Sequence, residues 1–175
     1  MLQAQQYWQW QFCEQHNVLI LDMGDMQFAT PFKRRQLTDE AFSNPNFNLQ
    51  DADFYQQVCQ YLSTFSIWTN AQICQIALNA TAVKHYLKPM LAKSWFFNSY
   101  TGTAPNQEAI VQLTSKAQSG QFLIVDCDQS ASVCLCLEPQ FALDDNLSLM
   151  QFEVIKVLND RIEPLFYAQG QQKRA

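Results

Sequence analysis

Glycine and histidine are scarce in this sequence, with 4 and 2 occurrences among 175 residues. Loops that cradle phosphate groups depend on clustered glycines, and the chain has no P-loop, GxGxxG, GxSxG or HExxH motif. A catalytic Cys–His pair would have to use His16 or His85. On the helix expected around it, His85 would lie about 16 Å from Cys74, too far for proton transfer. We therefore expect no catalytic activity and no cofactor.

Paired cysteine motifs are also missing, since none of the six cysteines belongs to a CxxC pair. Cys134 and Cys136 alternate within an expected strand, which places both thiols on one face of a sheet. Zinc sites usually draw on paired Cys or His motifs, so we expect small buried hydrophobic residues here rather than metal ligands. A thiol or metal enzyme that uses Cys134 and Cys136 is the alternative from another functional class.

Long apolar runs are absent as well. No stretch approaches the ~20 apolar residues that span a bilayer, and the N-terminal residues lack the basic and apolar regions of a secretory signal. We therefore expect a cytoplasmic protein that does not bind membranes. The net charge of −5 leaves no large basic face for nucleic acid, and the longest basic run is Lys33-Arg34-Arg35.

Acidic residues are missing from the middle of the chain, between Asp53 and Glu108. Three lysines, Lys84, Lys88 and Lys93, lie within this span. One interpretation is a buried segment that simply carries few acids. The other is a cationic, partly apolar surface reserved for an acidic partner. Aromatic residues beside the lysines favour the second interpretation, because basic groups around an apolar patch suit an acidic peptide with hydrophobic anchors.

Apolar side chains are plentiful: 48% of the residues are hydrophobic and 13% are aromatic, enough for a substantial core. Alternation of large and polar residues predicts strands at 7–12, 18–23 and 26–30, with the first two paired as a hairpin. Trp8 and Trp10 lie on one side of the first strand. They are either sheet core or a stacking platform for a ligand.

Two helices are predicted next. The first begins near Asn48, and this asparagine or a neighbouring residue can cap it. The helix carries one apolar stripe. The second opens with the capping box Thr69-Asn-Ala-Gln72 and is apolar on almost every side. Pro89 cannot continue this helix and turns the chain into an extended segment. Lys84, near the end of the helix, either reaches solvent or faces a cleft.

The second half of the chain has the pattern of a β-rich domain. Strands are predicted at 94–99, 109–113, 121–126 and 132–137, followed by a hairpin at 141–143 and 147–149. The recurrence of Phe152, Ile155, Leu158 and Ile162 at helical spacing predicts a late helix that Pro164 ends.

The expected fold class is therefore α+β. It consists of an N-terminal α/β domain at residues 1–92 and a β-rich C-terminal domain with a late helix at residues 93–168. Residues 169–175 are expected to be a frayed tail.

Several short segments also carry a family resemblance. They are Trp8-Gln-Trp10, Leu19-Ile-Leu-Asp22, Leu37-Thr38 with Ala41-Phe42, Leu78-Asn-Ala80, Tyr86-Leu-Lys-Pro89, Lys93-Ser-Trp95, and Asn159-Asp-Arg161 with Pro164. In this order, and over nearly the whole chain, they resemble the ZapC family of cell-division proteins. The combination of Tyr86-Leu-Lys-Pro89 with Lys93-Ser-Trp95 is the most specific part of the resemblance.

The resemblance implies a non-enzymatic monomer that binds polymerised FtsZ, bundles its filaments and stabilises the division ring at mid-cell. It implies an N-terminal α/β domain and a twisted, barrel-like C-terminal β domain, each with a pocket. An adaptor for another acidic protein is the alternative function.

The resemblance also implies binding residues. Basic residues around an apolar centre are expected to contact FtsZ, and the matching positions are Lys88, Lys93 and Arg161. Trp95 is expected to supply apolar contact. Leu21 is expected to shape the N-terminal pocket, although packing in the core explains this residue equally well.

Overall fold

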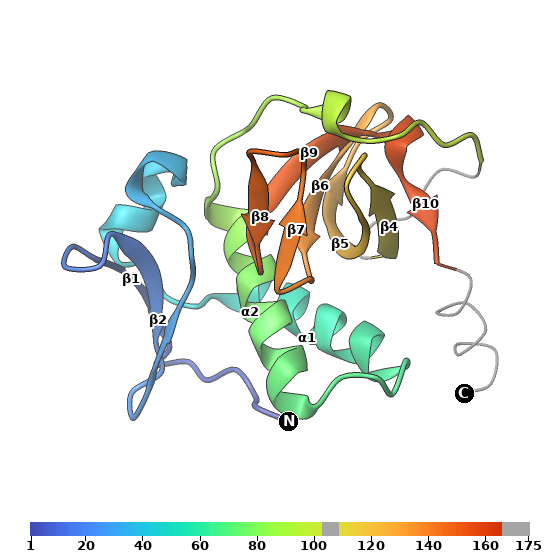
Figure 1. Ribbon diagram of the computed structural model, residues 1–175. Coiled ribbons are helices and arrows are strands. Elements are labelled where there is room, and N and C mark those ends of the chain that lie inside the picture. Colours follow the sequence, from blue (N-terminus) through green and yellow to red (C-terminus); the bar gives the residue numbers. More distant parts are fainter. Residues whose placement is uncertain (103–108, 166–175) are drawn as a thin grey trace. The chain divides into compact units, whose positions relative to one another are not determined.

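Across the residues that the structure describes, the fold is an α+β mixture of two α-helices and three antiparallel sheets, as the sequence predicts. The computed structural model describes residues 1–102 and 109–165. The chain divides into two compact units, Met1–Pro89 and Met90–Ala175 (Figure 1). The domain limits expected at residues 92 and 168 stay a prediction, and the tail expected at 169–175 lies outside the described residues.

The first unit contains a three-stranded sheet in the order β1-β2-β3. Its antiparallel strands are β1 (Gln9–Cys13), β2 (Val18–Asp22) and β3 (Gln27–Ala29), so the predicted hairpin is confirmed. Trp8 and Trp10 are buried, and both rings pack against Phe47, with centroids 5.3 and 5.8 Å away. The stacking platform for a ligand is therefore wrong, and the two tryptophans are core.

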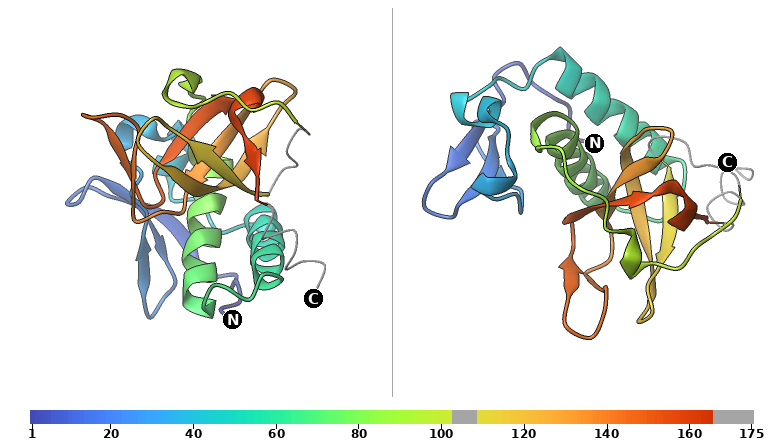
Figure 2. Two further views of the ribbon diagram at one scale, coloured as in Figure 1. Left: turned by 45° about the vertical axis from the view of Figure 1, so that its right-hand side comes forward. Right: turned by 90° about the horizontal axis from the view of Figure 1, so that it is seen from above.

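Two helices lie side by side in the first unit, α1 (Leu49–Ser63) and α2 (Asn70–Tyr86) (Figures 1 and 2). The short 3₁₀ helices η1 (Arg34–Gln36) and η2 (Asp39–Ser43) precede them. Both predicted caps are confirmed, because Asn48 and Thr69 accept hydrogen bonds from the third N–H of their helices. Within residues 1–102 and 109–165, no helix is long and apolar enough to cross a membrane.

Helix α2 is buried along most of its length. Its buried residues are Ile73, Cys74, Ile76, Ala77, Leu78, Asn79, Ala80, Thr81, Ala82, Val83 and Tyr86. Near its end, the Lys84 ammonium group lies 5.8 Å from the centre of the Phe54 ring on α1, so this lysine packs along the helix pair.

The predicted end of α2 is confirmed at Tyr86. The next residue, Leu87, is extended and forms an isolated bridge with Leu37. The N–H of Lys88 then donates to the carbonyl of Gln36 at 2.8 Å. Lys88 is thus an exposed residue whose backbone is held beside the end of η1.

The described part of the second unit is built on an antiparallel sheet of five strands in the order β10-β4-β5-β6-β9. The strands are β4 (Ile110–Thr114), β5 (Ser119–Cys127), β6 (Ala131–Cys136), β9 (Val154–Leu158) and β10 (Glu163–Pro164). A separate hairpin of β7 (Gln140–Ala142) and β8 (Ser148–Met150) projects from the twisted sheet (Figure 2). A β-bulge between Ile124 and Asp126 adds to the bending of the sheet.

One face of this sheet packs with residues of the β7–β8 hairpin, Phe97 and Ile162 into a continuous apolar core. Its buried members are Phe97, Val111, Leu113, Phe122, Ile124, Cys134, Cys136, Phe141, Leu143, Leu149, Ile155, Val157 and Ile162. The expectation that Cys134 and Cys136 share one face of a strand is confirmed, because both thiols belong to this core.

The late helix predicted from Phe152 to Ile162 is wrong. The segment is strand β9 followed by the single 3₁₀ turn η4 (Asn159–Arg161). Phe152 has a φ of 69°, in the left-handed region, so a right-handed helix cannot start there. Ile155 and Val157 alternate into the core, and β-branched residues suit this pleated surface.

The strand predicted at residues 94–99 is also wrong. Ser94–Phe96 form the 3₁₀ turn η3, which is closed by a hydrogen bond from the N–H of Phe97 to the carbonyl of Ser94. Phe97 then makes an isolated bridge with Ser115. Only this one bridge remains of the predicted strand, and the turn before it directs Trp95 to the surface.

Candidate functional site

Three segments of the second unit converge on a pocket with a volume of about 620 Å³. We call it the Trp95 pocket. It is lined by Lys93, Trp95, Phe96, Phe97, Asn98, Lys116, Leu143, Asp144 and Leu147. The pocket therefore combines two lysines, one carboxylate and a mainly apolar wall.

The first wall is the Trp95 turn, residues 93–97. Trp95 is 71% exposed, and its ring lies 5.5 Å from that of Phe96 between centroids. Phe97 is buried, with its ring centroid 6.1 Å from that of Phe141 in the core. An exposed indole next to an anchored phenylalanine is an apolar contact surface on a rigid base.

The other walls are the turn between β4 and β5, which carries Lys116, and the β7–β8 hairpin, which carries Asp144 and Leu147. Asp144 has a local task, because its carboxylate accepts the N–H groups of Asn146 and Leu147, each at 2.8 Å. These bonds hold the pKa of the Asp144 carboxyl below its usual range. The pocket thus combines two lysines with one carboxylate that stays ionised at neutral pH.

Leu158 and Arg161, which lie outside the Trp95 turn, hold it in place through hydrogen bonds to Ser94. The Ser94 hydroxyl accepts the N–H of Leu158 at 2.7 Å, and the Ser94 carbonyl accepts Nε–H of Arg161 at 3.3 Å. The other end of the Arg161 guanidinium donates from Nη1 to Asp160 at 2.6 Å. Arg161 is therefore close to the Trp95 turn, but it is not among the residues that line the pocket.

The predicted binding residues are thus divided between the two units. Lys93 and Trp95 line one pocket, and Arg161 supports it from behind. Lys88 belongs to the first unit. Leu21 is completely buried on β2, where its register partners are Trp10 and Phe28. This burial agrees with core packing, and a role of Leu21 in shaping the N-terminal pocket stays a prediction.

Lys116, Asp144 and Leu147 are pocket residues that the sequence reading missed. They come from the turns of two hairpins, which meet the Trp95 turn only through contacts between residues far apart in the sequence. The bridge between Phe97 and Ser115 is the link to the β4–β5 turn. Lys116 in a predicted turn was the one sign in the sequence of a basic residue at this place. Nothing in the sequence around it indicates which residues lie next to it in the fold.

The first unit has a pocket of about 700 Å³ beside α1. It is lined by Met1, Leu2, Gln3, Ala4, Ala52, Tyr55, Gln56, Cys59, Gln60 and Ser63. The Tyr55 hydroxyl closes it on one side by donating to the carbonyl of Leu2 at 2.7 Å. None of these residues has a charged side chain, so an acidic ligand finds no lysine or arginine partner there.

The basic run of the first unit is partly engaged. The Arg34 guanidinium lies 4.5 Å from the ring centre of Phe12 and 4.7 Å from that of Phe42, and it pairs with Glu14. Cation–π contacts of this kind stabilise a local arrangement. We therefore interpret Arg34 as part of the surface structure of the first unit.

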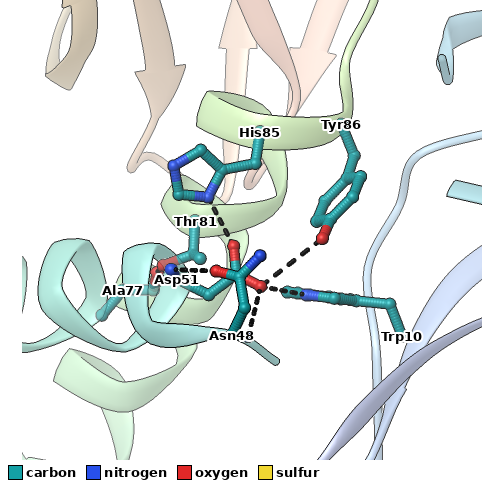
Figure 3. Close-up of polar contacts among 7 residues, drawn as sticks. All are labelled: Trp10, Asn48, Asp51, Ala77, Thr81, His85 and Tyr86. Atoms are coloured by element: carbon teal, nitrogen blue, oxygen red, sulfur yellow. Dashed lines mark hydrogen bonds and ion pairs between the residues drawn. The ribbon is translucent and has the colours of Figure 1, made fainter. Parts of the chain in front are cut away.

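A buried carboxylate connects the elements of the first unit (Figure 3). Oδ2 of Asp51 accepts Nε1–H of Trp10 at 3.1 Å, the N–H of Asn48 at 3.2 Å and the hydroxyl of Tyr86 at 3.5 Å. Its Oδ1 lies 2.5 Å from Nδ1 of His85. Burial, with the nearby Asp51 carboxylate, raises the pKa of Tyr86 above its ordinary value, so Tyr86 stays a donor. Asp51 thus joins β1, the start of α1 and the end of α2.

The chemistry of the thiols bears on the enzyme alternative. Burial raises the pKa of Cys136 to about 12 and raises the pKa of Cys134 well above its ordinary value. A protonated thiol in the core is a poor nucleophile and a poor metal ligand. Among the described residues, no three His, Cys, Asp or Glu side chains come together to hold a metal ion.

We expect Cys134 and Cys136 to react with DTNB far more slowly than the half-buried Cys13 and Cys127. Each unit by which the pKa rises above the pH lowers the thiolate fraction about tenfold. Thiol titration of the native protein at about pH 8, followed by titration in denaturant, measures the difference. Rapid alkylation of Cys134 or Cys136 in the native Cys13→Ser/Cys127→Ser protein, located by mass spectrometry, would support the enzyme alternative instead.

Comparison with known protein families finds two that match this chain. "Cell-division protein ZapC, N-terminal" matches residues 1–88, and "Cell-division protein ZapC, C-terminal" matches residues 89–168. The chain is 61% identical over 166 residues to the cell division protein ZapC of Pseudoalteromonas translucida, covering 94% of each chain. It is 36% identical to that of Shewanella woodyi, covering 94% of this chain and 92% of the relative. It is 34% identical to that of Aeromonas hydrophila, covering 99% and 98%.

Proposed function

Because the chain belongs to the ZapC family of cell-division proteins, we propose that it binds polymerised FtsZ and promotes the lateral association of FtsZ filaments. The observation that carries this proposal is the Trp95 pocket, which is lined by an exposed tryptophan and two lysines. The protein acts in the cytoplasm at the mid-cell division ring, as a monomer, without a cofactor and without catalysis.

Each side chain of the pocket has a proposed role. Lys93 and Lys116 attract acidic groups of the filament and fix the orientation of the complex. Trp95 inserts into an apolar depression of the partner, since tryptophan is among the residues that dominate binding energy at interfaces. Lys88, exposed in the first unit, is proposed as an additional cationic contact.

Co-sedimentation with polymerising FtsZ tests the proposal. At low salt the protein is expected to pellet with the filaments and to increase their light scattering. At high salt both signals are expected to fall, because exposed charges are screened. Absence of pelleting and of any scattering increase at low salt would overturn the proposed function.

Charge reversal tests the pocket itself. Lys93→Glu and Lys116→Glu are each expected to weaken binding about tenfold, because each replaces attraction by repulsion at the interface. Lys33→Glu is the matched control, since Lys33 is an exposed lysine of the first unit and its reversal changes the net charge equally. A titration of pelleted protein against FtsZ measures all three. Equal losses in all three variants would indicate a general charge effect and no specific role for the pocket.

A further inference from the structure

The Trp95 turn is held in place by hydrogen bonds to β9 and η4. The N–H of Lys93 donates to the carbonyl of Lys156 at 2.8 Å. One residue later, the Ser94 hydroxyl accepts the N–H of Leu158 and the Ser94 carbonyl accepts Nε–H of Arg161. Ser94 is buried, whereas its neighbour Trp95 is exposed. Ser94 is therefore the anchored residue of a turn that displays the next side chain.

The base of this anchor is itself fixed. Within η4, Asn159 accepts the hydroxyl of the buried Ser132 at 2.6 Å and donates from Nδ2 to the carbonyl of Asp128 at 3.0 Å. Its N–H donates to the carbonyl of Ser130 at 2.9 Å. The turn between β5 and β6 thus holds η4, and η4 holds Arg161 two residues further on.

The Arg161 side chain is partly buried and already hydrogen-bonded within the protein, unlike a cation that is free to bind a partner. Its side chain is only 21% exposed. Nε is used by the Ser94 carbonyl and Nη1 by the neighbouring Asp160, whose carboxylate offsets the positive charge. Asp160 also accepts the N–H of Tyr100 through its backbone carbonyl at 2.6 Å. Arg161 thus links η4 to the Trp95 turn, and the Asp160 backbone links η4 to the segment that follows it.

We infer that Ser94 and Arg161 are positioning residues, which act on partner binding by holding the turn that presents Lys93 and Trp95. The inference rests on the proposed function for its consequence in binding. It replaces the expectation that Arg161 contacts an acidic group of FtsZ directly. An exposed aromatic side chain on a fixed turn binds better than one on a mobile segment, because less freedom is lost on association.

The first test uses the protein without its partner. Labelling with fluorotryptophan gives one fluorine NMR signal for each of the 4 tryptophans, and Trp95→Phe assigns the signal of Trp95. In Arg161→Lys and in Ser94→Ala, the Trp95 signal is expected to shift and broaden while the signals of the buried Trp8 and Trp10 stay unchanged. An unchanged Trp95 signal in both variants would overturn the inference.

The second test separates position from charge in binding to FtsZ filaments. Arg161→Lys keeps the positive charge but cannot reproduce the planar guanidinium bond to the Ser94 carbonyl. If Arg161 positions the turn, Arg161→Lys and Arg161→Gln lose affinity alike, by about tenfold. If Arg161→Lys binds like the wild type while Arg161→Gln does not, the charge is the active feature and the inference is wrong.

Ser94 provides an independent arm of the same test. Ser94→Ala removes the acceptor of the Leu158 N–H, whereas Ser94→Thr keeps the hydroxyl. We expect Ser94→Ala to lose affinity about tenfold and Ser94→Thr to restore most of it. The exposed Ser99→Ala is the matched control and is expected to bind normally. Binding by Ser94→Ala that equals that of Ser99→Ala would contradict a positioning role.

The results of these tests distinguish a failure of this inference from a failure of the proposed function. If the wild-type protein does not pellet with FtsZ, the proposed function falls, but the fluorine signals still decide whether Ser94 and Arg161 hold the turn. If the wild type pellets and the Trp95 signal does not respond to either variant, the proposed function stands and this inference falls.

Discussion

Replacing Asp51 with alanine is expected to lower the free energy of unfolding by about 3–5 kcal/mol, the cost typical of breaking a buried charged network from one side. The carboxylate is only 1% exposed, and its four partners come from three parts of the first unit. Alanine leaves the indole N–H of Trp10 without an acceptor in the core and removes the partner of His85. It also breaks the capping box at the start of α1.

Urea denaturation followed by circular dichroism measures this loss. Asp53→Ala is the matched control, because Asp53 lies on the same helix but is exposed. Its removal is expected to change stability by at most ~0.5 kcal/mol, as is usual for surface substitutions. If the two variants unfold at the same urea concentration, Asp51 is not the organising residue of the first unit.

Replacing Trp95 with alanine is expected to weaken binding to FtsZ filaments by ~30-fold or more, the loss of ~2 kcal/mol that defines a hot-spot residue. The indole is 71% exposed in the free protein, so it is available to a partner and contributes little to the core. The stability of the variant is therefore expected to stay close to that of the wild type. A co-sedimentation titration gives the affinity, and thermal unfolding gives the stability.

Leu91→Ala is the control for Trp95→Ala. Leu91 is 87% exposed and lies only four positions earlier in the chain, but it does not line the pocket. We expect its replacement to leave the affinity within about twofold of the wild type, since most interface truncations away from hot spots cost little. Similar losses for both variants would argue for a diffuse apolar surface in place of the Trp95 pocket.

Much of the fold could be predicted because it depends on interactions between residues close together in the sequence. The caps at Asn48 and Thr69 need only residues three positions apart, and the break before Pro89 follows from proline geometry. The prediction of a late helix was wrong for a physical reason. Phe152, Ile155 and Ile162 recur at helical spacing, yet tertiary pairing of β9 with β6 decides the structure of that segment.

The site was predictable only in part. The absence of acids around Lys93 and Trp95 pointed to a cationic surface, and both residues do line one pocket. Lys116 and Leu147 could not be placed, because the hairpins that carry them meet the Trp95 turn only through long-range contacts. These are the bridge between Phe97 and Ser115 and the hydrogen bond from the Ser115 hydroxyl to the Ala142 carbonyl. The sequence also could not distinguish a contact role for Arg161 from a support role, since that difference lies in one hydrogen bond to Ser94.

The burial of α2 limits how far this protein can change over evolutionary time. Ala77, Ala80 and Ala82 are completely buried, so even one added methylene at these positions must find room in a packed interior. The exposed glutamines of α1 that do not line the 700 Å³ pocket, Gln50 and Gln57, face no such restriction. Sequence drift is therefore expected to be slow along α2 and fast along the outer face of α1, whatever partner the protein serves.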